Sequence, residues 1–337
     1  MFVSDLIKKI PVDTKRRVSE ANQRYNKTIR EVVRSVTRLN LNAPEQVGHK
    51  IRGRQGVSVS VDSIGYPKDF EEKSIPNDLT LSALLSLRKT QLLKLRDSTN
   101  SIGRLLQKPK NSVERETQDL IFKLHPKVGS LAPSLGESFE VSEILLKESG
   151  RYDLIGELFK LIDEDILGHY FYKLPKGDSR QIPLLEQELP PTSSRIVLYW
   201  GVIGLVAEVL NLSVEDLTVV VMAHELAHAY THLGFDIDGY YWNTYSFYKS
   251  DRALVEGLAQ YYTEKALKIL SVKIPGGYGA YEELLRNQPS AYHTHNKWIK
   301  DTTPEAVRTA LITMRKKNPI ALNKFNDKLQ TIGIQYK

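Results

Sequence analysis

The 337-residue chain contains no cysteine. This absence excludes disulfide frameworks, thiolate zinc fingers, thiol nucleophiles and iron–sulfur clusters held by cysteine. A metal site in this chain must therefore be built from histidine and carboxylate side chains. Only eight histidines are available for it.

Long hydrophobic runs are also missing. The longest, residues 196–207, ends at Glu208 after twelve residues, which is too short to span a membrane, and we expect a buried helix there. The first residues reach Asp5 and Lys8 too early to form the apolar segment of a secretory signal. The sequence therefore predicts a soluble, cytoplasmic protein with no membrane span.

Positive charge is concentrated at one end of the chain. Residues 1–56 contain thirteen Lys and Arg against five Asp and Glu, whereas the remainder has thirty-four against thirty-five, so the formal net charge of +7 comes entirely from this segment. Such a segment permits contact with nucleic acid or an acidic partner. A solvated helix face produces the same count at least as often.

Apolar periodicity predicts a mainly helical α+β fold. Short alternating stretches at 57–61 and 168–172 predict two strands. Ser193 or Ser194 is expected to cap a helix that runs through 197–210, and Ser213 to begin the next. Spacings of three and four predict further helices at 15–39, 81–106, 253–270, 280–286, 304–316 and 322–329.

Proline and glycine gather between Pro126 and Gly136, which predicts a domain boundary there. We divide the chain into residues 1–136, a basic and mostly helical N-terminal region of unknown role, and residues 137–337, a second domain.

The most informative segment is His224-Glu225-Leu226-Ala227-His228, inside an apolar helical stretch. Two histidines four residues apart on a helix lie on one face, so their rings can bind one ion, with Glu225 beside it. The alternative is a core helix whose histidines bond to neighbouring side chains and whose glutamate forms a buried pair. An unpaired carboxylate in so apolar a helix would cost several kcal/mol, which favours the metal site.

A catalytic zinc needs a third protein ligand, and Glu256 is the best candidate. It lies early in the helix expected after Asp251, beside Gly257 and Ala259, which are small enough for close approach to the HExxH helix. The alternative for Glu256 is a solvent-facing carboxylate in the first helical turn.

His232, Asp236 and Asp238 are the rivals for the third ligand. Histidines at 224, 228 and 232 would span about 12 Å along one helix, too far for one ion. We therefore expect His232 to lie next to the ligands or at the surface.

The pair His224-Glu225-Leu226-Ala227-His228 and Val255-Glu256-Gly257-Leu258-Ala259 resembles the gluzincin metallopeptidases of the zincin superfamily. The resemblance implies a zincin-like metallopeptidase domain over 137–337. It implies one Zn²⁺ per chain, held by His224, His228 and Glu256, and hydrolysis of peptide bonds in a peptide or protein substrate with Glu225 as general base.

The chain also departs from the gluzincin pattern. Twenty-seven residues separate His228 from Glu256, more than in thermolysin-like enzymes. The aspartate that those enzymes place four residues after the ligand glutamate is Gln260, whose carbonyl can still accept a hydrogen bond from a ligand ring. The G-x-M-E-N segment of zinc aminopeptidases is absent. Thr231 stands where metzincins require glycine, so that alternative fails.

Peptide hydrolysis also needs a donor to the oxyanion, usually tyrosine or histidine. By resemblance, the cluster Tyr292-His293-Thr294-His295 is favoured because it follows Glu256, and His293 and His295 are the predicted catalytic donors. The tyrosines at 240, 241, 245 and 248 are the alternatives.

Two other classes of function compete with hydrolysis. In one, residues 1–56 bind nucleic acid or an acidic protein and the zinc is structural. In the other, a catalytically silent peptidase-like domain binds another protein through its cleft.

Overall fold

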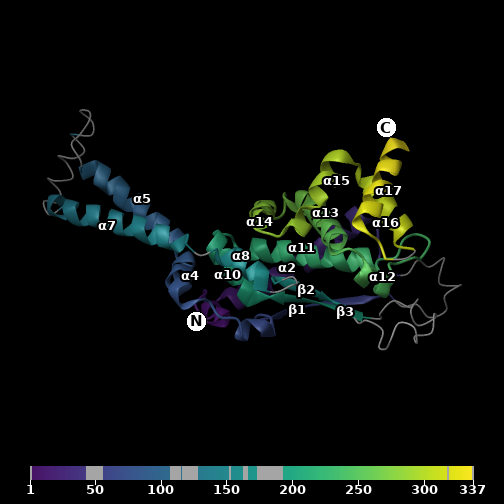
Figure 1. The fold of residues 1–337 in the computed structure, drawn as a ribbon, viewed down its shortest axis with the longest axis horizontal. Helices are drawn as coiled ribbons and strands as arrows, with labels where there is room; N and C mark the ends of the chain where they lie inside the picture. Colours follow the sequence, from purple (N-terminus) through teal and green to yellow (C-terminus); the bar gives the residue numbers. More distant parts are fainter. Residues whose placement is uncertain are drawn as a thin grey trace. The chain divides into compact units, whose positions relative to one another are not determined.

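The computed structural model describes residues 2–42, 56–106, 115, 128–151, 153–161, 166–172, 193–316 and 319–335. Its contacts divide the chain into two compact units: unit 1 (Met1–Ile10 and Asp69–Glu157) and unit 2 (Pro11–Lys68 and Leu158–Lys337), with elements labelled in Figure 1. Within these ranges, no helix has both the length and the apolar character needed to cross a membrane.

Unit 1 is helical. Its helices are α1 (Val3–Ile7), α4 (Thr80–Ser86), α5 (Lys89–Leu106) and α7 (Val128–Ser149), with a 3-10 turn η2 (Asn77–Leu79). The helix predicted over 81–106 is thus two helices, and the second of them packs along α7. The boundary predicted near residue 137 falls inside α7, and the division into 1–136 and 137–337 stays a prediction. Helix α8 (Leu154–Leu161) and the 3-10 turn η1 (Lys68–Glu71) each contain residues of both units.

Unit 2 contains the sheet and the remaining helices. Its strands are β1 (Ser58–Ile64), β2 (Gly168–Phe171) and β3 (Ser193–Tyr199). Its helices are α2 (Thr14–Thr37), α10 (Trp200–Leu210), α11 (Val214–Leu233), α12 (Thr244–Lys249), α13 (Arg252–Leu270), α14 (Pro275–Arg286), α15 (His295–Asp301), α16 (Pro304–Met314) and α17 (Leu322–Gln335), with the 3-10 turn η3 (Ser290–His293).

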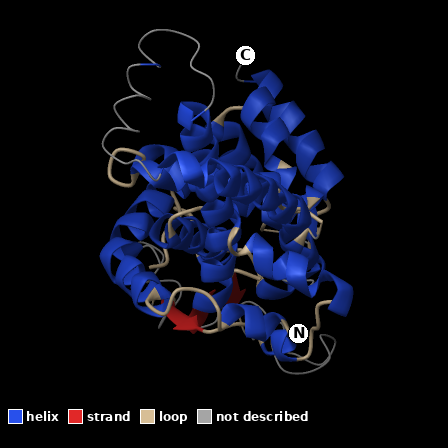
Figure 2. Cartoon of the chain, turned by 90° about the vertical axis from the view of Figure 1, so that its left-hand side faces the viewer, coloured by secondary structure: helices blue, strands red, loops and turns tan. Residues whose placement is uncertain are grey.

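The sheet has the order β1-β3-β2. Strand β3 pairs in parallel with β1, with Ser58 opposite Ser193, and antiparallel with β2, with Gly168 opposite Leu198. The sheet is therefore mixed, and among the described strands β2 lies at one of its edges. Figure 2 shows how small the sheet is beside the helices, which confirms the mainly helical α+β fold.

The prediction of a helix capped by Ser193 or Ser194 is wrong for the residues before Trp200. Residues 193–199 form the central strand, and the helix begins only at Trp200. Ile196, Val197 and Leu198 are almost completely buried between the neighbouring layers. A short continuous apolar run fits a central strand as well as a buried helix, so its periodicity could not distinguish them.

Helix α11 lies at the centre of unit 2. It packs against α2, against α13, and against β2 and β3. In Figure 1 it runs between the strands and α13. Packing on several sides leaves the helix buried almost throughout, from Leu217 to Leu233 without a break. Side chains from α11 are therefore held away from solvent by the surrounding layers.

Candidate metal centre

Helix α11 carries His224, Glu225 and His228. The predicted start is confirmed: the Ser213 hydroxyl accepts a hydrogen bond from the backbone N–H of Asp216 and caps the helix. The two histidines lie one turn apart on the same face, and their ring centroids are 4.6 Å apart. All three side chains are buried, with Glu225 only 1% exposed.

Helix α13 brings Glu256 to the same place. It packs against α11, and Glu256 is buried in its first turns. A Cβ on Gly257 would meet Thr294 and Trp298 at 3.0 Å, so the small residue allows α15 and the turn before it to approach α13. Gly257 was expected to allow close approach to the HExxH helix, but the atoms nearest to its position belong to Thr294 and Trp298.

The three donor atoms converge. The two Nε2 atoms of His224 and His228 are 3.1 Å apart, and Oε2 of Glu256 lies 3.3 Å from the first and 3.4 Å from the second. Ligands about 2.0–2.2 Å from a tetrahedral zinc ion are separated by about 3.3–3.5 Å. Among the residues that the structure describes, this group of two histidines and one glutamate can hold one metal ion.

The charge balance at Glu256 also favours a cation. Burial disfavours its charged form, but the neighbouring His228 and His224 outweigh that cost, so the pKa of Glu256 is lowered well below its usual value. Its buried Oε2 accepts no well-aligned hydrogen bond from any described residue, although both rings lie within 3.4 Å. A buried acceptor of this kind is a site that a metal ion satisfies.

Glu225 packs closely against Gly168, the first residue of β2. A Cβ added to Gly168 would meet the Cγ1 of Val221 at 2.7 Å and the Oε1 of Glu225 at 3.0 Å. His224, Glu225 and Gly168 line one small cavity of about 20 Å³. Gly168 was not among the predicted site residues, because its close approach to α11 depends on contacts between segments that are far apart in the sequence.

His232 is neither a ligand nor at the surface. It is fully buried, its Nδ1 lies 3.0 Å from the hydroxyl of Tyr170, and its Nε2 lies 3.1 Å from that of Thr244. Burial, with a smaller effect of the charges at His228 and Arg315, lowers its pKa to about 3, so its ring is neutral. Of the two positions expected for His232, the one at the surface is therefore wrong.

Asp236 and Asp238 take other roles. Oδ1 of Asp236 accepts the backbone N–H groups of Asp238 and Tyr240, and its Oδ2 lies 3.4 Å from the buried Arg315. Asp238 is exposed beside Lys316. Neither aspartate belongs to the metal-binding group.

The two predicted oxyanion donors lie after Glu256, on η3 and α15. His295 is fully buried; its Nε2 lies 2.9 Å from the Tyr281 hydroxyl, and its Nδ1 lies 2.9 Å from the carbonyl oxygen of Tyr292. His293 contacts the carbonyl oxygen of Gln288 at 3.1 Å. The catalytic role of both histidines stays a prediction.

Two more residues, Tyr292 and Gln260, lie near His224. The ring of Tyr292 stacks on that of His224 with centroids 5.8 Å apart. Gln260 lines the small cavity and donates from Nε2 to Gln288 at 3.0 Å. Its Oε1 is buried and accepts no hydrogen bond from a described residue, so the expected bond to a ligand ring is not formed.

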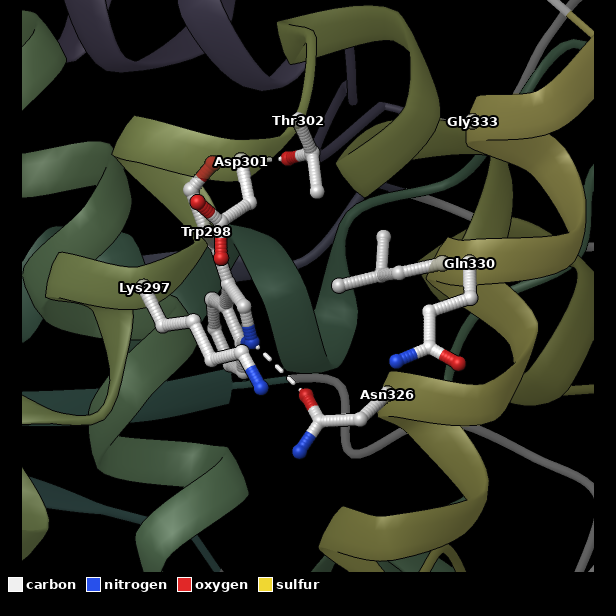
Figure 3. A pocket seen from close by; sticks show the side chains of 8 residues that line it. Lys297, Trp298, Asp301, Thr302, Asn326, Gln330 and Gly333 are labelled. Carbon is white, nitrogen blue, oxygen red and sulfur yellow. Dashed lines mark hydrogen bonds between the residues drawn. The ribbon is translucent and has the colours of Figure 1, made fainter.

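Larger cavities also lie in unit 2, and two of them differ in their relation to the metal-binding group. One, of about 280 Å³, is lined by His228 and Glu256 together with aromatic side chains. The other, of about 310 Å³, lies between α15 and α17, where the indole of Trp298 donates to Oδ1 of Asn326 (Figure 3). None of the three metal-binding residues lines the second cavity, whereas two of them line the first.

Comparison of this chain with models of protein families, with curated proteins and with solved structures finds no match. The buried cluster of His224, His228 and Glu256 is nevertheless consistent with a zinc site of the HExxH-and-glutamate type.

Proposed function

We propose that the protein is a zinc-dependent metallopeptidase of the gluzincin type, with one zinc ion per chain. The observation that carries this proposal is the triangle of donor atoms from His224, His228 and Glu256, with sides of 3.1–3.4 Å, beside a buried glutamate. Three protein ligands leave a fourth position open, which distinguishes catalytic zinc sites from structural ones.

The two histidines and Glu256 would hold the metal. When bound, zinc supplies Lewis acidity, which polarises a carbonyl oxygen and makes water nucleophilic at neutral pH. Glu225 is adjacent to a ligand in sequence and shares the small cavity with His224. It would accept the proton of the attacking water and deliver it to the leaving nitrogen, so the peptide bond is broken without a covalent intermediate.

Strand β2 provides a place for the substrate backbone. It is an edge of the sheet, and its first residue lies against Glu225. An extended peptide that pairs with such an edge is held by main-chain hydrogen bonds, independently of its side chains. Pairing there would carry a scissile bond toward Glu225, which supports a peptide or protein as substrate.

Metal analysis combined with a peptide library tests the proposal. We expect one zinc per chain, cleavage of some peptides, and loss of cleavage on chelation that added zinc restores. Glu256→Ala should lower zinc affinity by more than the 10–100-fold typical of losing an outer hydrogen-bond partner. Asp238→Ala, at an exposed rival position, should leave it unchanged. Full zinc binding by the Glu256 variant, or zinc without cleavage of any peptide, contradicts the proposal.

A second proposal concerns nucleic acid or an acidic partner at residues 1–56. Lys27, Arg30 and Arg34 of α2 line an open groove of about 470 Å³. Binding there should weaken steeply as salt rises, as counterions are released. Because α2 packs on α11, the test is Lys27→Glu with Arg34→Glu rather than deletion. A flat salt response of DNA binding would instead favour a solvated helix face.

A further inference from the structure

We propose that the cavity beside His228 and Glu256 binds an aromatic side chain of the substrate. The proposal rests on the function proposed above and specifies its substrate. Four aromatic residues line this cavity, which we call the aromatic cleft: Tyr170, Tyr172, Phe247 and Tyr248. Because two metal-binding residues also line it, a group in the cleft lies next to the reacting bond.

Half of the aromatic residues of the cleft come from the long segment between His228 and Glu256. Tyr170 comes from β2 and Tyr172 follows it directly, whereas Phe247 and Tyr248 lie on α12, between the two metal-binding helices. The proposal therefore gives the 27 residues that separate His228 from Glu256 a role. They place a wall of the cleft beside the metal ligands.

His232 fixes the walls in place. Its ring stacks on Phe247, with centroids 4.2 Å apart and planes 4° apart, and meets Tyr172 edge-on at 5.0 Å. Tyr172 also meets Phe247 edge-on at 5.4 Å. Hydrogen bonds at both ring nitrogens, one donated and one accepted by the neutral ring, tie His232 to Tyr170 and Thr244. A cleft held this way needs little ordering when a ligand enters.

The shape and chemistry of the cleft favour an aromatic ring over other side chains. Rings attract one another most strongly edge-to-face or offset-stacked, beyond the effect of the area they bury. Tyr248, which lines the cleft, is 52% exposed, so an entering ring can contact the part of its surface that Lys249, 5.2 Å from its ring centroid, does not cover. Arg252 lines the same cleft, so the peptides with Glu test whether charge selects the substrate instead.

Calorimetric titration of zinc-loaded Glu225→Gln protein tests the inference, because this variant should bind peptides without cutting them. The probes are six-residue alanine peptides with one Phe, Leu or Glu at each position in turn. At one position we expect Phe to bind about two- to tenfold more tightly than Leu. Adding Tyr248→Ala should remove most of that preference.

Tyr245→Ala is the matched control, because Tyr245 lies on the same helix, is 39% exposed and does not line the cleft. It should leave the preference for Phe unchanged. The inference is overturned if no peptide binds, if Leu or Glu binds as tightly as Phe at every position, or if both Tyr248→Ala and Tyr172→Ala preserve the preference.

Cleavage of the same peptides by the unmodified protein, followed by mass spectrometry, separates the two proposals. If the preference for Phe depends on Tyr248 but nothing is cleaved, the aromatic cleft stands and the hydrolase proposal fails. If peptides are cleaved with no preference for Phe, the hydrolase proposal stands and the aromatic cleft fails.

Discussion

Helices α2 and α11 pack against each other, but they differ in the burial of their polar side chains. In α2 the buried residues form one stripe, and the charged side chains lie outside it. In α11 the buried residues follow one another without a break and include His224, Glu225 and His228.

The difference shows which polar groups need a chemical explanation. Water compensates the charges of α2, so their number says little about function. Most of α11 is buried, so its polar side chains must be satisfied by the protein or by a bound ligand instead of bulk solvent. Changes to buried polar groups should therefore have large effects and changes to exposed ones small effects, and the following predictions test this contrast.

The largest effect is expected at Glu225. Glu225→Gln keeps the size of the side chain and removes the base, so turnover should fall by about 10²–10⁴-fold while zinc stays bound. The measurement is the rate of peptide cleavage together with zinc content. Glu31→Gln makes the same chemical change on the exposed face of α2 and should alter neither. Unchanged cleavage by the Glu225 variant would refute the mechanism.

Arg315 should have the largest effect on stability. Its buried guanidinium donates to the carbonyl oxygens of Gly234 and Tyr240 and lies 3.4 Å from Asp236. Arg315→Met would leave the buried Asp236 without this partner, at a cost of about 3–5 kcal/mol in unfolding free energy, measured by urea denaturation.

Lys316→Ala is the control for Arg315. Lys316 lies 3.9 Å from the same carboxylate of Asp236 but is partly exposed, so its loss should cost less than about 1 kcal/mol. Equal effects of the two substitutions would show that burial does not set the cost at this position.

A smaller effect is expected at Gly168, where β2 approaches α11. In Gly168→Ala the new Cβ must displace Val221 or Glu225, costing about 1–3 kcal/mol of stability. A displacement of Glu225 by about 1 Å should slow cleavage by up to about 10²-fold with zinc still bound. Gly279→Ala, where nothing lies within 4 Å of the new Cβ, should not destabilise the protein. Full cleavage by the Gly168 variant would mean that this contact does not position Glu225.

The contrast between the helices also explains how much could be predicted from the sequence. The helix over 15–39 was found from its periodicity, because one face of α2 meets solvent. The metal-binding cluster was found from the types and spacing of its residues. The strand at 193–199 was missed because its neighbours in the sheet lie far away in sequence. The aromatic cleft and Gly168 depend on contacts between β2, α11 and α12, which no local pattern contains.

The smallest effect is expected where α2 and α11 meet at the surface. Nη2 of Arg17 lies 2.6 Å from Oε2 of Glu215, with both side chains about one-third exposed. The hydrogen bond from Arg17 lowers the pKa of Glu215 from 4.5 to about 2. Solvent screens an exposed pair, so a double-mutant cycle with Arg17→Ala and Glu215→Gln should give only about 0.2–1 kcal/mol.

The sign of the pH dependence follows from that shift. Because the pKa is lower in the folded state, the pair stabilises the protein above about pH 4.5 and loses this effect as the pH falls toward 2. Urea unfolding at pH 7 and pH 3 should show a coupling energy that is smaller at pH 3. A coupling above 2 kcal/mol, or one that does not change with pH, would place this pair with the buried groups of α11 and break the contrast.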